Sequence, residues 1–299
     1  MIQKFPQSYI ILDALDECGD RTVLIDILEG ITEWRLKKLH VLVTSRNEPG
    51  IEISLESIAN EQNTICLDTK LVDRDIEKYV RQRLSNDRVL RKWQRDPVLR
   101  HEIEVRLMKG AHGMFRWAAC QLDALGQCCN RVQLRKSLAT LPPTLDETYN
   151  RILCGIDDID SEYAVRILRW LTFSSRPLTL DEIAEVIAID SERDPAFDSE
   201  EVFKDPLDVL RICSSLVTIT TTEEPDEESD DEESDEESDD DLTSNELRKL
   251  TGQIVALAHY SVKEYLVSER CRQSRAARYS MQHTPCNEFI AKCCLAYLL

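Results

Sequence analysis

Acidic side chains follow an apolar run close to the start of the sequence. Tyr9–Leu12 has the composition of a buried strand, and Asp13, Asp16 and Glu17 come directly after it. A carboxylate at a strand tip can hold Mg²⁺ or its water ligands, and further acids can orient or deprotonate an attacking water. The pattern predicts the acidic half of a nucleoside triphosphate site, with Asp13 as metal ligand and Asp16 and Glu17 as catalytic acids.

The phosphate-binding half of such a site has no counterpart in the sequence. None of the eight glycines belongs to a G-x-x-x-x-G-K-[ST] loop. That loop, its lysine and the helix N-terminus behind it supply most contacts to the phosphates, and carboxylates alone repel a polyanion. We therefore expect no measurable ATP hydrolysis by this chain.

Strands and helices that alternate along the sequence must position these acids. Residues 23–34 have helical spacing, Leu39–Val43 forms a second buried strand, and Thr64–Leu67 has the pattern of a short third strand. Such alternation predicts a parallel α/β sheet. Arg46 follows the second strand, where its guanidinium either bridges phosphate oxygens or pairs only with Asp13 or Asp16.

The rest of the chain is mostly helical. A helix is predicted from the capping acid Asp73 to Leu84, and further helices form a small bundle. Three later helices and a two-stranded hairpin predict a winged-helix plan. The predicted helices cover residues 97–109, 113–125, 134–138, 145–153, 162–171, 180–189, 207–214, 261–268 and 287–299, and the hairpin strands cover 216–220 and 253–258.

The net charge of −19 comes from one segment. Residues 223–241 contain fifteen of the 56 acids and no base, which leaves 41 acids against 37 bases elsewhere. We expect residues 223–245 to be a disordered acidic insertion in the wing, as a solvated spacer or, through its serines, a kinase substrate. The nearly neutral remainder argues against nucleic-acid binding. Arginines in residues 270–278 could contact nucleic acid or, more easily, the acidic insertion.

The composition also indicates a compartment. The sequence has no secretory signal and no apolar run of the roughly 20 residues that span a bilayer. Its eleven cysteines show no C-x-x-C spacing, and the pairs Cys128-Cys129 and Cys293-Cys294 suit buried reduced thiols. We expect a cytoplasmic protein that does not bind membranes.

Three of these segments resemble one family. Asp13-Ala-Leu-Asp-Glu17 is similar to the Walker B segment of NACHT-type NTPases of the STAND class, in which a small residue follows the Mg²⁺-binding Asp. Arg46 stands where that family has its sensor 1 residue. His259 opens a segment similar to the H-x-S-x-x-E-[FY]-L motif of NACHT winged helices, where the histidine contacts the β-phosphate of ADP. The resemblance implies ATP or ADP and Mg²⁺ as cofactors of the family, although we expect this chain to bind none.

Two packing motifs narrow the resemblance. Residues 113–122 and 141–153 are similar to linker-helix signatures of fungal NACHT proteins that often carry ankyrin repeats. We expect a NACHT switch truncated before Walker B, whose partners are proteins: other copies or the missing NACHT half. The alternative is a genuine short protein that acts as a non-catalytic interaction or decoy module.

The predicted fold class is therefore an α/β remnant of a parallel P-loop NTPase sheet, followed by a helical bundle and a winged-helix-like domain, and mostly α overall. The expected domains are the end of the NACHT nucleotide-binding domain (1–70), a helical domain (71–155), the winged helix (156–222), the acidic insertion (223–245) and the end of the winged helix with C-terminal helices (246–299).

Overall fold

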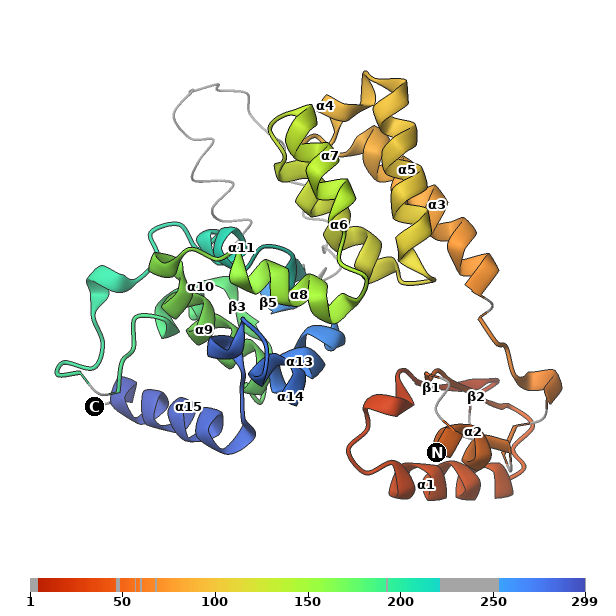
Figure 1. The fold of residues 1–299 in the computed structure, drawn as a ribbon. Coiled ribbons are helices and arrows are strands. Elements are labelled where there is room, and N and C mark those ends of the chain that lie inside the picture. The colour runs from red at the N-terminus through yellow and green to blue at the C-terminus, as the bar shows by residue number, and fades with distance from the viewer. Residues whose placement is uncertain are drawn as a thin grey trace, which may run out of the picture. The chain divides into compact units, whose positions relative to one another are not determined.

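The structure, a computed structural model, divides the chain into two compact units, residues 1–68 and 69–299 (Figure 1). The predicted domain boundaries stay predictions, and the predicted acidic insertion lies outside the described residues. The structure describes residues 5–46, 49–56, 58–59, 61–67, 69–191, 193–220 and 253–298.

The first unit is built on two parallel strands. Strands β1 and β2 pair in register from Ser8 opposite Leu39 to Leu12 opposite Val43, which confirms the predicted parallel pairing. Helix α1 connects them, and the Asp20 side chain caps it by accepting a hydrogen bond from the Val23 N–H at 3.3 Å. The elements are β1 (Ser8–Leu12), α1 (Arg21–Glu33), β2 (Leu39–Val43) and α2 (Pro49–Glu56), with 3-10 turns at Leu15–Glu17 and Glu61–Asn63.

The core of the first unit is small. It consists of Leu15, Leu28 and Ile51 with a few half-buried neighbours. The predicted third strand at Thr64–Leu67 is wrong: the segment makes no ladder with either strand, and Ile65 is 87% exposed. An apolar run becomes a strand only where a neighbouring strand offers its backbone groups, and the described part of this unit offers none there.

The second unit begins with a helical bundle. Helix α3 contains the predicted helix and buries Ile76, Val80 and Leu84 on one face. Asp73 does not cap that helix, which begins at Thr69. Its carboxylate instead accepts a hydrogen bond from the Gly113 N–H at 3.0 Å and ties α3 to the start of α6. The bundle helices are α3 (Thr69–Asn86), α4 (Arg91–Gln94), α5 (Pro97–Ala111), α6 (Phe115–Gln127) and α7 (Arg131–Ala139) (Figure 1).

Trp117 is the largest fully buried side chain in the core of the bundle. It is fully buried, and its Nε1 donates a hydrogen bond to the carbonyl oxygen of Pro142 at 2.8 Å. Gly110 of α5 lies against the indole, so closely that an added Cβ would stand 2.4 Å from the Trp117 ring. The absence of a side chain at Gly110 therefore allows α5 and α6 to pack at this distance.

The winged-helix plan predicted from the sequence follows the bundle, with one more strand than expected. Strand β5 lies between β3 and β4, and both pairings are antiparallel. The sequence pattern missed β3 because two residues are too short for an alternating period. The elements are α8 (Leu145–Cys154), α9 (Asp158–Phe173), β3 (Leu178–Thr179), α10 (Leu180–Val186), α11 (Asp208–Cys213), β4 (Val217–Thr220), β5 (Ile254–Leu257), α13 (Tyr260–Val267), α14 (Glu269–Arg272) and α15 (His283–Leu298).

Side-chain caps start several of these helices. Thr144 accepts a hydrogen bond from the Glu147 N–H at 3.2 Å before α8. Thr179 and Glu182 form a reciprocal capping box at α10, and Arg176 pairs with the same glutamate. That ion pair lowers the pKa of Glu182 to about 2, although partial burial opposes the shift. The caps set where each helix begins and therefore which face it buries.

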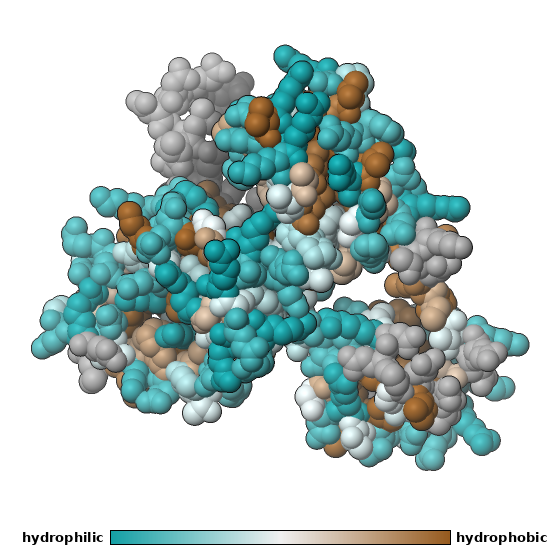
Figure 2. Space-filling model, in the orientation of Figure 1, coloured by the Kyte–Doolittle hydropathy of each residue, from teal (hydrophilic) through white to brown (hydrophobic). Residues whose placement is uncertain are grey.

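Polar side chains cover most of the visible surface, with apolar ones scattered between them (Figure 2). The basic residues 270–278 contribute ion pairs to the body itself, namely Arg270 with Asp146, Arg272 with Glu269 and Arg278 with Asp158. No helix in the described ranges combines the length and apolar character that crossing a bilayer requires.

The cysteines are all free thiols. Within the two adjacent pairs, Cys128 is half-buried and Cys293 is buried, whereas Cys129 and Cys294 are exposed. The expectation that these pairs are buried is therefore wrong for one member of each. Neighbouring residues on a helix or at its end point about 100° apart, so both cannot face the same core.

We predict that Gly110→Ala destabilises the bundle by about 1–3 kcal/mol, because the new methyl group overlaps the Trp117 ring. Gly30→Ala in α1 is the matched control. Nothing lies within 4 Å of its added Cβ, so the better helix propensity of alanine stabilises α1 by about 0.5–1 kcal/mol. Amide hydrogen exchange in α5 and α6 and in α1 measures both effects. Equal effects of the two substitutions would contradict this packing.

Candidate functional site

Thr44 organises the turn that follows β1. Because parallel strands end at the same edge of a sheet, the residues after β1 and β2 meet there. The Thr44 hydroxyl donates to the Asp13 carboxylate, and its oxygen accepts from the Ala14 N–H at 2.9 Å. The Thr44 backbone adds hydrogen bonds to Leu12 and Leu15, both at 2.9 Å. Thr44 was not predicted as a site residue from the sequence. Its hydroxyl at the end of the second strand could have indicated that it holds the turn after the first strand.

Ala14 adopts a left-handed backbone conformation, with φ 56° and ψ 55°. This conformation costs a residue with a Cβ roughly 1–2 kcal/mol, and a small side chain limits the crowding. The turn sends Leu15 and Asp16 inward, where both are buried, and leaves Asp13 and Glu17 exposed. The sharp reversal thus separates the four residues into an inner and an outer pair.

The Asp16 carboxylate is held by the residues that follow β2. Its Oδ1 accepts hydrogen bonds from the Arg46 N–H at 3.0 Å and the Ser45 hydroxyl at 3.4 Å, and its Oδ2 lies 3.2 Å from Arg46 Nε. The Asp16 side chain is 5% exposed. Burial raises the pKa of this carboxyl, but the donors from Arg46 and Ser45 outweigh burial and hold the pKa below its usual range. Of the two interpretations weighed for Arg46, pairing with an acid is the one seen in this structure.

Asp16, predicted as a catalytic acid, and Arg46, predicted to read a phosphate, are engaged with each other. In this arrangement neither is open to a magnesium-bound nucleotide. Asp13 remains an exposed carboxylate with a hydrogen bond from Thr44. Within the described ranges, no group of three or more His, Cys, Asp or Glu side chains could hold a metal ion.

His259 belongs to the second unit and caps helix α13. Its Nδ1 accepts a hydrogen bond from the Ser261 N–H at 3.1 Å and lies 2.7 Å from the Ser261 hydroxyl. The same hydroxyl is 2.8 Å from the phenol oxygen of Tyr149, a fully buried residue of α8. The structure therefore brings Asp13, Asp16 and Arg46 together in the first unit and gives His259 its contacts in the second.

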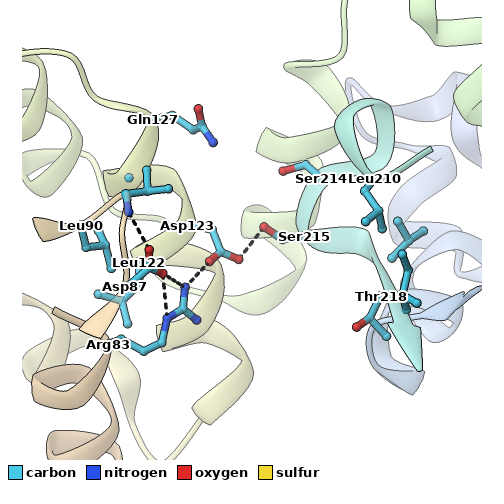
Figure 3. A pocket seen from close by; sticks show the side chains of 14 residues that line it. Arg83, Asp87, Leu90, Leu122, Asp123, Gln127, Leu210, Ser214, Ser215 and Thr218 are labelled. Carbon is cyan, nitrogen blue, oxygen red and sulfur yellow. Dashed lines mark hydrogen bonds and ion pairs between the residues drawn. The ribbon is translucent and has the colours of Figure 1, made fainter. Parts of the chain in front are cut away.

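A cavity of about 350 Å³ lies in the second unit, between α3 and α6 on one side and α11 and β4 on the other (Figure 3). Arg83 donates to Asp87 and Asp123, each at 2.9 Å. Burial lowers the pKa of Arg83, whereas the two carboxylates raise it and prevail. The Ser215 hydroxyl then donates to Asp123 at 2.9 Å, across the junction between bundle and winged helix. Sequence patterns gave no signal for this contact, because its partners are 92 residues apart.

Two family models match parts of the chain. One is described as Nephrocystin 3, N-terminal, and matches residues 1–46, which include β1, β2 and the acidic turn. The other is described as GPI inositol-deacylase, winged helix domain, and matches residues 149–225. No solved structure matches the chain significantly.

Two curated fungal proteins are similar over most of this chain. The azaphilone pigments biosynthesis cluster protein L of Monascus ruber is 37% identical over 201 residues, 67% of this chain and 37% of that protein. The vegetative incompatibility protein HET-E-1 of Podospora anserina is 30% identical over 219 residues, 71% of this chain and 15% of that protein. The chain thus spans well under half the length of both relatives. Together, the two family models and the two fungal relatives show that the chain belongs to the fungal NACHT-domain proteins.

Proposed function

We propose that this chain is part of a NACHT-family signalling switch and that by itself it neither binds nor hydrolyses ATP. The observation that carries the second half of the proposal is the ion pair between the buried Asp16 carboxylate and the exposed Arg46 side chain. In this pair, Asp16 and Arg46 bind each other, although a nucleotide would need both the acid and the cation. A metal-bound nucleotide would have to replace these contacts with its own, and the described residues offer no phosphate-binding loop that could supply them.

We propose that regulation by a nucleotide takes place in the longer proteins of the family. There, His259 would contact the β-phosphate of ADP, Arg46 would read the γ-phosphate, and Asp13, Asp16 and Glu17 would serve Mg²⁺ and the attacking water. One relative is named for vegetative incompatibility, which agrees with a signalling role.

A second candidate function is a non-catalytic interaction module, and the exposed sheet of the first unit favours it. Tyr9 and Ile11 of β1 are 66% and 67% exposed, and Leu42 of β2 is 57% exposed. Within the described chain, each of these two strands also has an outer edge that pairs with no further strand. Exposed apolar side chains and unpaired strand edges are typical of interaction surfaces. Protein partners, either other copies or a further NACHT segment, would cover such a surface.

We predict that the purified chain releases no phosphate from Mg²⁺-ATP above the level of a Glu17→Gln variant. The physical reason is that Asp16 and Arg46 already satisfy each other. Release of radiolabelled phosphate measures turnover, and the variant controls for contaminating ATPases. Turnover several-fold above the variant would contradict the proposal.

We also predict that Asp16 makes the first unit acid-sensitive. Its folded-state pKa lies below the unfolded value, so the ionised carboxylate stabilises the fold above about pH 4. This contribution is lost as the pH falls through the lowered pKa. Asp16→Asn should therefore cost roughly 1–3 kcal/mol at pH 7 and progressively less toward pH 3.

Hydrogen exchange of the β1 and β2 amides, corrected for intrinsic rates at each pH, measures this difference. Asp26→Asn is the matched control, because Asp26 is exposed on α1. A cost of Asp16→Asn that stays constant from pH 7 to pH 3, or one no larger than that of Asp26→Asn, would show that Asp16 is not held as an ion.

A further inference from the structure

Strand β4 has one free edge. In the part of the chain that the structure describes, it is the outermost strand of the order β3-β5-β4. Just before it, the Ala258 N–H donates to the Leu216 carbonyl oxygen at 2.9 Å, so this pair is hydrogen-bonded. Because bonded and non-bonded pairs alternate in an antiparallel ladder, Thr218 also directs its backbone groups toward β5, whereas Ile219 directs its N–H and C=O outward. Among the described residues, neither of these two groups has a hydrogen-bond partner on that outer side.

The cavity of about 350 Å³ lies along this free edge (Figure 3). Val217, Thr218 and Ile219 all line it. Successive side chains of a strand point to opposite faces of the sheet, so a cavity that contacts three in a row lies at the edge of the strand and not against one face. Since β5 occupies the other edge, the cavity faces the outward N–H and C=O of Ile219.

Much of the remaining cavity wall is apolar. On the bundle side, Leu90 and Leu122 are buried and Val89 is 51% exposed. On the winged-helix side, Leu210 is half-buried. The volume lies at the lower end of the roughly 300–1,000 Å³ that is typical of ligand sites. The cavity can therefore take an aliphatic side chain from a strand that adds to β4.

The charged side chains of the cavity disfavour an acidic ligand. They are Arg83, Asp87 and Asp123, one base against two acids, which gives the lining a net charge of −1. Arg83 is held by both carboxylates, each at 2.9 Å, and by the Tyr79 phenol at 2.8 Å. The side chains of Asp87 and Asp123 remain 23% and 34% exposed, so their oxygens can also accept from a cation of a ligand.

We propose that the free edge of β4 binds an extended, basic peptide segment of a protein partner. The segment adds a strand to the sheet, places a Val, Ile or Leu side chain in the cavity, and brings a Lys or Arg side chain to Asp87 and Asp123. Hydrogen bonds with the backbone of Ile219 supply affinity, and the cavity supplies specificity.

Charge decides against another occupant from this chain. Residues 223–241, which follow β4 in the sequence, contain fifteen acids and no base, and they would be repelled by a lining with an excess of carboxylate. The proposed site also lies in the second unit and involves neither the acidic turn nor a nucleotide. It therefore goes beyond the proposed function and does not depend on it.

The test uses the full chain and two synthetic heptapeptides with blocked ends, one of alternating Lys and Val and the other of alternating Glu and Val. Residue-resolved amide hydrogen exchange, measured by NMR, locates the binding site. At about ten times the dissociation constant of the Lys–Val peptide, the Ile219 amide should exchange about tenfold more slowly. The Thr218 amide already bonds to β5 and should change far less. The Glu–Val peptide should bind at least about tenfold more weakly, because it brings like charges together.

Ile219→Pro removes the outward donor and leaves the ladder with β5 intact, because the N–H of residue 219 takes no part in that ladder. It should weaken binding of the Lys–Val peptide about three- to tenfold, the size of one net hydrogen bond. Ile219→Val keeps both the N–H and an apolar side chain, so this matched control should bind as the wild type does. If Ile219→Pro does not fold, the exchange of the wild-type Ile219 amide decides the question.

Three results would overturn the proposal: equal affinity for the two peptides, an Ile219 amide that does not slow at millimolar peptide, or one that is already protected in the free chain. Slowing confined to the β1 and β2 amides would also overturn it, because the peptide would then bind the sheet of the first unit. Since no nucleotide is present, the outcome of the ATP assay leaves this test unaffected.

Discussion

A buried carboxylate needs compensating donors, and this requirement governs the candidate site. Asp16 is 5% exposed at its side chain, so an unpaired negative charge there would cost several kcal/mol. Its donors come from the segment after β2, which therefore has to lie beside the turn after β1. In a unit with so few buried apolar side chains, this contact fixes the edge of the sheet. The contacts of Asp16 thus hold the acidic turn against the segment that follows β2.

Buried polar side chains of the second unit also need hydrogen-bond partners, and these come from segments far apart in the sequence. Tyr149 and Gln121 are fully buried and find their partners on other segments, Ser261 for the phenol and Thr148 for the amide. Arg116 adds contacts that reach the winged helix through Ser215. Apolar packing brings the bundle and the winged helix together, but these directional bonds allow only one arrangement of the side chains between them.

Much of the fold follows from local sequence patterns. The apolar runs of β1 and β2 and the helical spacing of α3 and α6 predicted these elements closely, because burial imposes periods of two and 3.6 residues. Thr64–Leu67 failed as a strand, and β3 escaped notice, because strand formation depends on a partner that no local pattern contains. The acids after β1 and Arg46 stood out by type and position, and His259 stood out through the family resemblance. Their predicted catalytic, metal-binding and cofactor-binding roles stay predictions. Thr44 and the contact of Tyr149 with Ser261 depend on residues 31 and 112 positions apart, which only the fold brings together.

The most direct test of this account is a double-mutant cycle on the closure of the acidic turn. The free energy of opening, obtained from hydrogen exchange of the β1 and β2 amides at pH 7, is compared for wild type, Asp16→Asn, Arg46→Gln and the double variant. If the two side chains hold each other, the coupling energy is roughly 1–2 kcal/mol, because the second substitution costs little once the first partner is gone. Strictly additive effects, with a coupling energy near zero, would contradict the claim that this ion pair closes the site.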